Sequence, residues 1–284
     1  SPFDAKLSVG SPRKDSLAPL LILTGLRLAG DWTPARWLGR LPSTGLRTAW
    51  LEKTTGTLSL VSKGGLVGDG LTMYAKLSDG LLYVDKLEAS PWQGTLQAEV
   101  TLERRRNQPF VAVAIELDQI EAAKLAAWLG VKSGISGSLD LRLEASSIGT
   151  TPYEMMAGLA GEMTIKAGPG EIKGVGVTAL REALMPDVEN GGPVARSLTL
   201  PFTSIEATTG LSRGILTVED GRLSILSESG GEAVSSIDGT VDLLLWIADL
   251  ILTTSPDQAD GEAAGTYRVI GPPDRPVGTI PFGN

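Results

Sequence analysis

The sequence contains no cysteine and no histidine. The lack of cysteine excludes a disulfide framework, a thiol nucleophile and a cysteine-ligated zinc. The lack of histidine excludes the most common general base and catalytic metal ligand, together with every Ser-His triad. We therefore expect a protein that is not an enzyme, with no catalytic residue, no cofactor and no bound metal.

Aromatic residues are also scarce, at 5% of the chain, whereas hydrophobic residues make up 42%. The interior must therefore be built from Leu, Val, Ile and Ala. The formal net charge is −8. An acidic chain does not neutralise phosphates, so we expect no nucleic-acid partner.

Long hydrophobic runs are absent as well. A helix needs roughly 20 apolar residues to cross a membrane, and residues 241–252, an apolar stretch, are shorter and include Asp242 and Asp249. We therefore expect any membrane anchor to lie outside this sequence.

One phrase occurs twice in the chain. An Asp-Gly pair at Asp79 and again at Asp220 is followed, after a variable stretch, by a Gly-Thr step at Thr95 and Thr240. Each Asp-Gly pair predicts a turn, because Gly accepts positive φ and Asp tolerates it. Each Gly-Thr step opens an alternating segment. Two such units predict a long antiparallel sheet built by repeating a meander.

Strict alternation of apolar and polar residues marks four segments, 95–103, 138–145, 162–167 and 216–219. A period of two predicts strands with one dry and one wet face, which is typical of antiparallel sheets. Residues 110–117 and 241–252 are almost entirely apolar and are expected to be strands buried on both faces.

The remaining elements are weaker predictions. Further strands are expected at 56–62, 71–77, 81–89, 199–208, 223–227 and 265–270, helices at 120–129, 152–159 and 177–184, and loops at 186–193 and 255–264. The fold class is therefore mainly β: a long twisted antiparallel sheet, curled into a groove or half-barrel, with two or three short helices. We expect one elongated domain over residues 1–284, and halves at 1–150 and 151–284 are the alternative division.

From about Gly70 onward the chain resembles the AsmA-like family of bacterial envelope proteins. The matching segments are the repeated phrase, 137–143, 159–165, 170–175 and 269–276. The resemblance implies a periplasmic protein anchored to the inner membrane. It also implies kinship with larger bridge-like lipid carriers that have a β groove and support outer-membrane homeostasis. The family offers no catalytic motif to transfer.

The apolar strand faces allow two interpretations. They can be the closed core of a sandwich, or the open concave face of a curved sheet that holds acyl chains. Composition favours the core, and the resemblance brings the two interpretations near parity. The candidate lipid-facing residues are Leu96, Ala98, Val100, Leu102, Leu139, Leu141, Leu143, Met163, Ile165, Leu216, Val218, Val241, Leu243 and Leu245.

The leading functional hypothesis is a non-enzymatic envelope protein that binds or conducts phospholipid acyl chains between the inner and outer membranes. Its expected partners are a phospholipid or another acyl-chain lipid, a membrane, and an envelope protein. The alternative is a protein-interaction module that assists outer-membrane protein assembly through exposed sheet edges.

Two carboxylate pairs were considered as acid–base catalysts. Asp118 and Glu121 lie at the entrance of an expected helix, where acids favour the helix dipole, and Glu219 and Asp220 lie at an expected turn. Both pairs are better explained by local structure.

Overall fold

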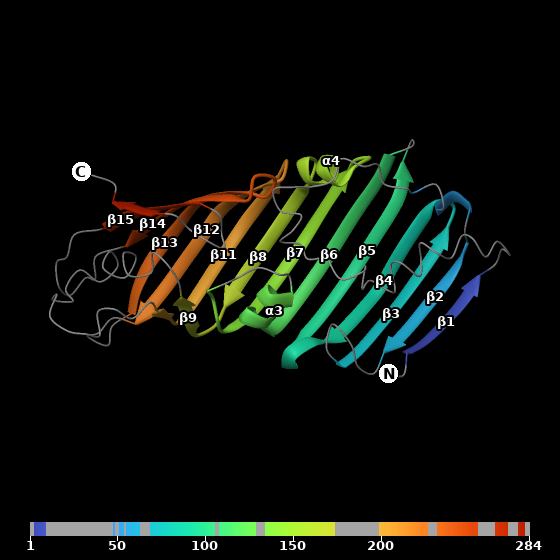
Figure 1. Ribbon diagram of the computed structural model, residues 1–284, viewed down its shortest axis with the longest axis horizontal. Coiled ribbons are helices and arrows are strands. Elements are labelled where there is room, and N and C mark those ends of the chain that lie inside the picture. Colours follow the sequence, from blue (N-terminus) through green and yellow to red (C-terminus); the bar gives the residue numbers. More distant parts are fainter. Residues whose placement is uncertain are drawn as a thin grey trace.

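The computed structural model describes residues 3–9, 48, 51–53, 55–62, 69–105, 108–128, 134–173, 199–226, 232–254, 265–271 and 278–281. Fourteen of the described strands form one antiparallel sheet, and they lie side by side along the long axis of the molecule (Figure 1). In order across the sheet they are β1 (Phe3–Val9), β2 (Gly56–Ser62), β3 (Asp69–Ser78), β4 (Leu81–Ser90), β5 (Thr95–Arg105), β6 (Gln108–Glu121), β7 (Ser138–Ile148), β8 (Ala160–Ala167), β11 (Ser204–Ser212), β12 (Ile215–Leu226), β13 (Glu232–Asp242), β14 (Ile247–Thr254), β15 (Gly265–Gly271) and β16 (Gly278–Pro281).

The sheet is open, because β1 and β16 lie at its opposite edges. Two short strands, β9 (Gly170–Lys173) and β10 (Thr199–Phe202), form a second, two-stranded sheet. Two short α-helices, α3 (Ala122–Trp128) and α4 (Pro152–Ala157), lie at opposite ends of the strands (Figure 1). The prediction of a mainly β protein with one long antiparallel sheet and few helices is confirmed. No helix among the described residues is long and apolar enough to cross a membrane.

Most of the predicted strands are confirmed. The alternating segments 95–103, 138–145, 162–167 and 216–219 lie within β5, β7, β8 and β12. The segment 56–62 coincides with β2, and 71–77, 81–89, 110–117 and 265–270 lie within β3, β4, β6 and β15. The predicted strand 199–208 is divided at Thr203, whose backbone N–H donates to the Ser224 carbonyl at 2.8 Å. The predicted strand 223–227 is the end of β12, which begins at Ile215. The predicted helix 177–184 and the loops 186–193 and 255–264 lie outside the described residues.

The first Asp-Gly pair forms the predicted turn. Asp79 and Gly80 join β3 to β4 with φ of 52° and 81°, the geometry of a two-residue hairpin turn. The second prediction was wrong, because the β11–β12 turn lies at Arg213 and Gly214, with φ of 52° and 73°. The Asp220-Gly221 pair instead lies inside β12, where its register with β13 shifts between Val218 and Arg222. A Cβ at Gly221 would come within 2.5 Å of the Ile237 carbonyl oxygen, so glycine is needed there for close approach rather than for turning.

Residues 241–252 were predicted as one buried strand, and this was wrong. The Asp242 carboxylate accepts hydrogen bonds from the backbone N–H groups of Leu244, at 2.8 Å, and Leu245, at 2.9 Å. This Asx-type turn ends β13, and β14 begins at Ile247. The step at Thr240 likewise does not open a strand, because it lies inside β13 beside Gly239, which has φ of 129°.

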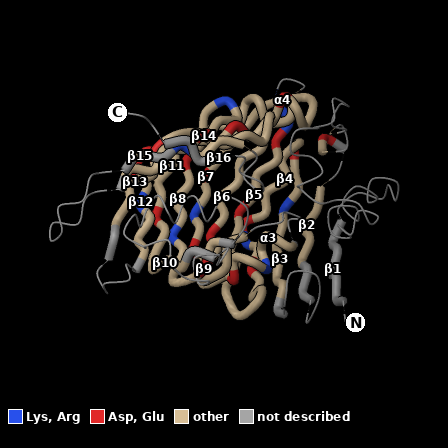
Figure 2. Tube along the Cα trace, turned by 60° about the vertical axis from the view of Figure 1, so that its left-hand side comes forward, with Lys and Arg blue, Asp and Glu red and all other residues tan. Residues whose placement is uncertain are grey.

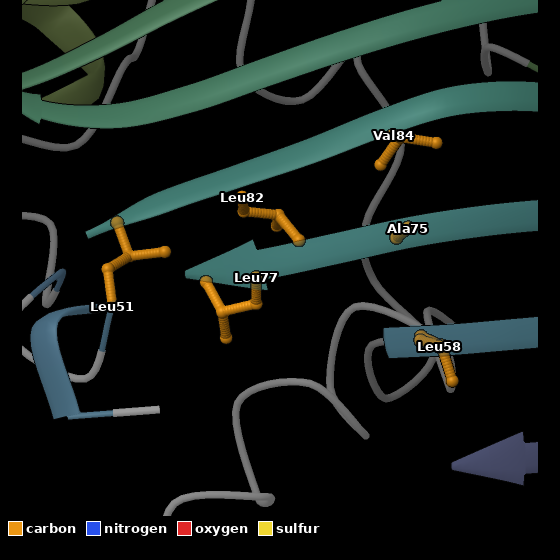
Figure 3. Close-up of a cluster of buried hydrophobic side chains, with 6 residues drawn as sticks. All are labelled: Leu51, Leu58, Ala75, Leu77, Leu82 and Val84. Atoms are coloured by element: carbon orange, nitrogen blue, oxygen red, sulfur yellow. The ribbon is translucent and has the colours of Figure 1, made fainter. Parts of the chain in front are cut away.

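Separate elements bury the two ends of one face of the sheet. At one end, the β9–β10 pair places Phe202 against Ala167, Leu223 and Ile225. At the other end, Leu51 of a short 3-10 turn (Leu51–Lys53) covers Leu58, Ala75, Leu77, Leu82 and Val84 (Figure 3). Burial of a large aliphatic side chain contributes about 1.5–3 kcal/mol, so these two clusters help to fix the covering elements onto the sheet.

Candidate functional site

The register of the sheet brings the predicted apolar residues onto one face. Residues directly opposite each other in an antiparallel ladder share a face. Val100 lies opposite Val84 on one side and Val113 on the other. Val113 in turn lies opposite Ala145 of β7, so the same apolar row continues from strand to strand.

Twelve of the fourteen candidate residues lie on this face. They are Leu96, Ala98, Val100, Leu102, Leu139, Leu141, Leu143, Met163, Ile165, Leu216, Val218 and Val241. We call these residues, together with Val84, Val111, Val113, Ile115 and Leu117, the apolar face. Leu243 and Leu245 lie outside it, because the Asp242 turn removes them from the strand ladder.

The centre of the apolar face is less covered than its ends. Val113, Leu141, Leu143 and Met163 are half-buried and lie between the two clusters. The interstrand spacing is about 4.8 Å. The eight adjacent strands from β4 to β13 therefore carry an apolar strip about 34 Å long across the sheet. Each leaflet contributes about half of the roughly 30 Å hydrocarbon core of a bilayer, so one acyl chain fits along this strip.

Four residues of β6 were not assigned to this face from the sequence. Val111, Val113, Ile115 and Leu117 face the same way as Leu141, because Leu117 lies opposite Leu141 in the ladder. The strand was predicted to be buried on both faces, which was wrong for its middle, where residues 111–115 are half-buried. A usable signal was present, because large and small residues alternate there and the alanines lie on the other face.

By the register of the ladders, the opposite face carries polar and charged residues such as Glu99, Glu144 and Lys166. Acidic and basic residues recur along the strands (Figure 2). Lys166 pairs with Glu206 at 3.5 Å, with side chains 65% and 52% exposed. The Arg268 guanidinium donates two hydrogen bonds to the Asp249 carboxylate. These bonds and the attraction between the two charges lower the pKa of Asp249 and raise the pKa of Arg268. This face is therefore the wet side of the sheet.

Shallow depressions on the polar face are poor sites for acyl chains. One of about 510 Å³ is lined by Glu99, Glu144 and Glu162 among small side chains. Glu144 and Glu162 lie directly opposite each other, and like charges in this position repel. The described residues contain no group of acidic side chains suited to holding a metal ion.

Two of the four carboxylates in the candidate catalytic pairs form ion pairs with basic side chains. Glu121 pairs with Lys124 at 2.7 Å, and Asp220 pairs with Arg222 at 3.4 Å. Asp118 lies opposite Thr95 in the ladder, and its side chain is on the exposed part of β6. Glu121 directly precedes α3, as expected for a helix entrance, whereas Asp118 lies within β6. The turn predicted at Glu219 and Asp220 is wrong, because both residues lie inside β12.

Comparison with known proteins gives one match. The model of the AsmA family matches residues 48–220, which include the strands from β2 to β8 and the chain as far as the middle of β12. No curated protein and no solved structure matches the chain.

Proposed function

Because the chain belongs to the AsmA family, we propose that it works without catalysis, by holding lipid acyl chains on the apolar face. Membership of this family indicates a protein of the bacterial envelope. Within the envelope, we propose a periplasmic location, with an inner-membrane anchor supplied by a segment outside this sequence. The lipid would pass between the inner and outer membranes and support outer-membrane homeostasis.

The observation that carries this proposal is the half-buried strip in the centre of the apolar face. A closed core would bury its central residues most deeply, because protein interiors are close-packed. Here Leu51, Ile120 and Ile225 are fully buried, two of them in the clusters formed with the covering elements, whereas Leu141 and Leu143 are half-buried. This pattern supports a groove whose walls are the covered strand ends and whose floor is the apolar strip.

The chemistry required for such a site is simple. Each methylene that leaves water contributes about 0.8 kcal/mol. A long acyl chain on a Leu, Val and Ile surface is thus held without a specific polar contact. Because only the acyl chain is recognised, the same site accepts lipids with different headgroups. The acidic polar face keeps the other side of the sheet hydrated.

Organic extraction of the purified protein, followed by lipid mass spectrometry, tests the proposal. We expect phospholipid in a fixed ratio to protein that persists through gel filtration. Protein that leaves cells free of lipid, and takes up none from added micelles, would contradict it.

A second candidate function uses the edges of the sheet. Among the described strands, β1 pairs only with β2, and β16 pairs only with β15. Pro281 in β16 removes one backbone donor, so β1 is the better edge for adding a strand from a partner. This candidate, a module for outer-membrane protein assembly, predicts capture of an extended peptide by lipid-free protein.

A further inference from the structure

Three chain connections meet at the end of the sheet where α4 lies (Figure 1). The Gly214 N–H in the β11–β12 turn donates to the Leu159 carbonyl after α4 at 3.2 Å. The Leu243 N–H in the β13–β14 connection donates to the Gly214 carbonyl at 2.9 Å. These bonds join residues 148–159, 212–215 and 242–247 into one surface, which we call the apolar rim.

The apolar rim exposes an unusual amount of hydrophobic surface. Its only charged side chains are Glu154, Arg213 and Asp242. Its exposed large hydrophobic residues, with the exposed fraction of each, are Leu245 (65%), Tyr153 (52%), Ile148 (46%), Ile247 (42%) and Ile215 (39%). Contiguous exposed apolar patches are uncommon on soluble proteins and mark interaction sites with proteins or membranes.

Local structure holds the most exposed residue in place. The Asp242 carboxylate binds the backbone N–H groups of Leu244 and Leu245, and Trp246 has φ of 55°, in the left-handed region. A non-glycine residue in this conformation is held by its surroundings. The sequence Leu-Leu-Leu-Trp from 243 to 246 thus forms a fixed turn with Leu245 at its exposed tip.

We propose that the apolar rim docks onto the surface of a lipid bilayer, with Leu245 and Tyr153 entering the boundary between headgroups and acyl chains. Trp and Tyr prefer this boundary, because their rings have an apolar body and a polar tip. Arg213, exposed at the neighbouring turn, suits lipid phosphate, which guanidinium groups bind well. The two acids are already engaged, Asp242 by the turn and Glu154 by Thr150.

The rest of the same sheet end is more charged and less exposed. Near β5 it carries the ion pairs Arg104–Glu52, at 3.2 Å, and Arg105–Glu103, at 2.6 Å. Leu81 and Tyr83, each 37% exposed, are its exposed large hydrophobic residues, so the most exposed ones lie from α4 to the start of β14. There the rim adjoins the apolar face, because Val241 and Leu216 lie next to the two turns. Docking at this rim does not rest on lipid already being bound to the apolar face.

Flotation of the protein with vesicles of phosphatidylethanolamine and phosphatidylglycerol tests this proposal, with Leu245→Ser as the variant. Val234→Ser is the matched control, because Val234 is 41% exposed and lies at the other end of β13. We expect the wild type and the control to float, and Leu245→Ser to lose about tenfold or more in vesicle affinity. Binding should persist at 1 M salt, where the Debye length is only about 3 Å.

Three results would overturn the proposal. The first is a wild type that does not float, and the second is a Leu245→Ser variant that binds as well as Val234→Ser. The third is self-association of the wild type that Leu245→Ser abolishes without any vesicle binding, which would make the rim a protein contact. Lipid extracted per molecule of protein should be unchanged in Leu245→Ser. Failure of docking is thereby separated from failure of acyl-chain binding.

Discussion

Replacement of Leu141 by Asp places a charge at the centre of the proposed groove. Leu141 lies in β7 between Leu117 and Ile165 of the neighbouring strands, and all three belong to the apolar face. Leu141 is half-buried, so the outcome depends on whether water still reaches the new carboxylate.

The two interpretations of this face differ in the expected loss of stability. Full burial of a leucine contributes about 1.5–3 kcal/mol, so a half-buried leucine contributes about 1–1.5 kcal/mol. If the groove is open, Asp stays hydrated and only this amount is lost. A domain with a total stability of roughly 5–15 kcal/mol then remains folded. If the face is closed, an unpaired buried charge costs several kcal/mol more.

Thermal melting and lipid loading of Leu141→Asp are measured together. Thr164→Asp is the control, because Thr164 is exposed and lies on the polar face opposite Arg142. We expect a folded Leu141→Asp protein with much less copurified lipid, and an unchanged lipid content in Thr164→Asp. A Leu141→Asp protein that unfolds would refute the open groove, and a folded one with full lipid loading would refute its role in binding.

Two further predictions concern the sheet itself. The pKa of Asp249 is lowered in the folded state by its hydrogen bonds to Arg268. This interaction therefore stabilises the protein fully at pH values above the ordinary Asp pKa of about 3.9. The stabilisation is lost as the pH falls through the lower pKa of the folded state. Asp249→Asn should therefore lower the melting temperature at pH 7, and the difference in melting temperature from the wild type should disappear in strong acid. A difference that stays constant with pH would contradict this. Gly239→Ala should cost about 1–3 kcal/mol in chemical denaturation, because the residue has φ of 129° and a Cβ would collide with the Asp249 carbonyl oxygen. Gly210→Ala, which meets only the flexible end of Glu219, should be tolerated, and equal losses in the two variants would refute the reasoning.

The sheet was predictable because its strands alternate. In segments such as 95–103 and 138–145 the polar set and the apolar set each occupy one face, and this pattern has no helical equivalent. The same pattern identified most of the apolar face, since a period of two fixes which residues share a side. The pairing of distant strands, such as β8 with β11 across the β9–β10 pair, depends on contacts that no local pattern contains.

The wrong predictions have a common physical origin. The Asp-Gly pair at Asp79 forms a turn, whereas Gly221 lies inside a strand, where the absence of a side chain lets another backbone approach closely. The apolar composition of residues 241–252 predicts one strand, whereas the Asp242 carboxylate ends the strand through two hydrogen bonds. A prediction from hydrophobicity alone therefore misses both the β13–β14 turn and the exposed apolar rim.

The most direct test of acyl-chain binding is to find where a lipid chain lies on the protein. A phospholipid with a photoreactive group near the end of one chain is loaded, activated and mapped by peptide mass spectrometry. We predict cross-links to the central apolar strip, at residues such as Val100, Leu143 and Met163. Cross-links confined to the polar face, or the absence of specific cross-links from a fully loaded protein, would contradict the account.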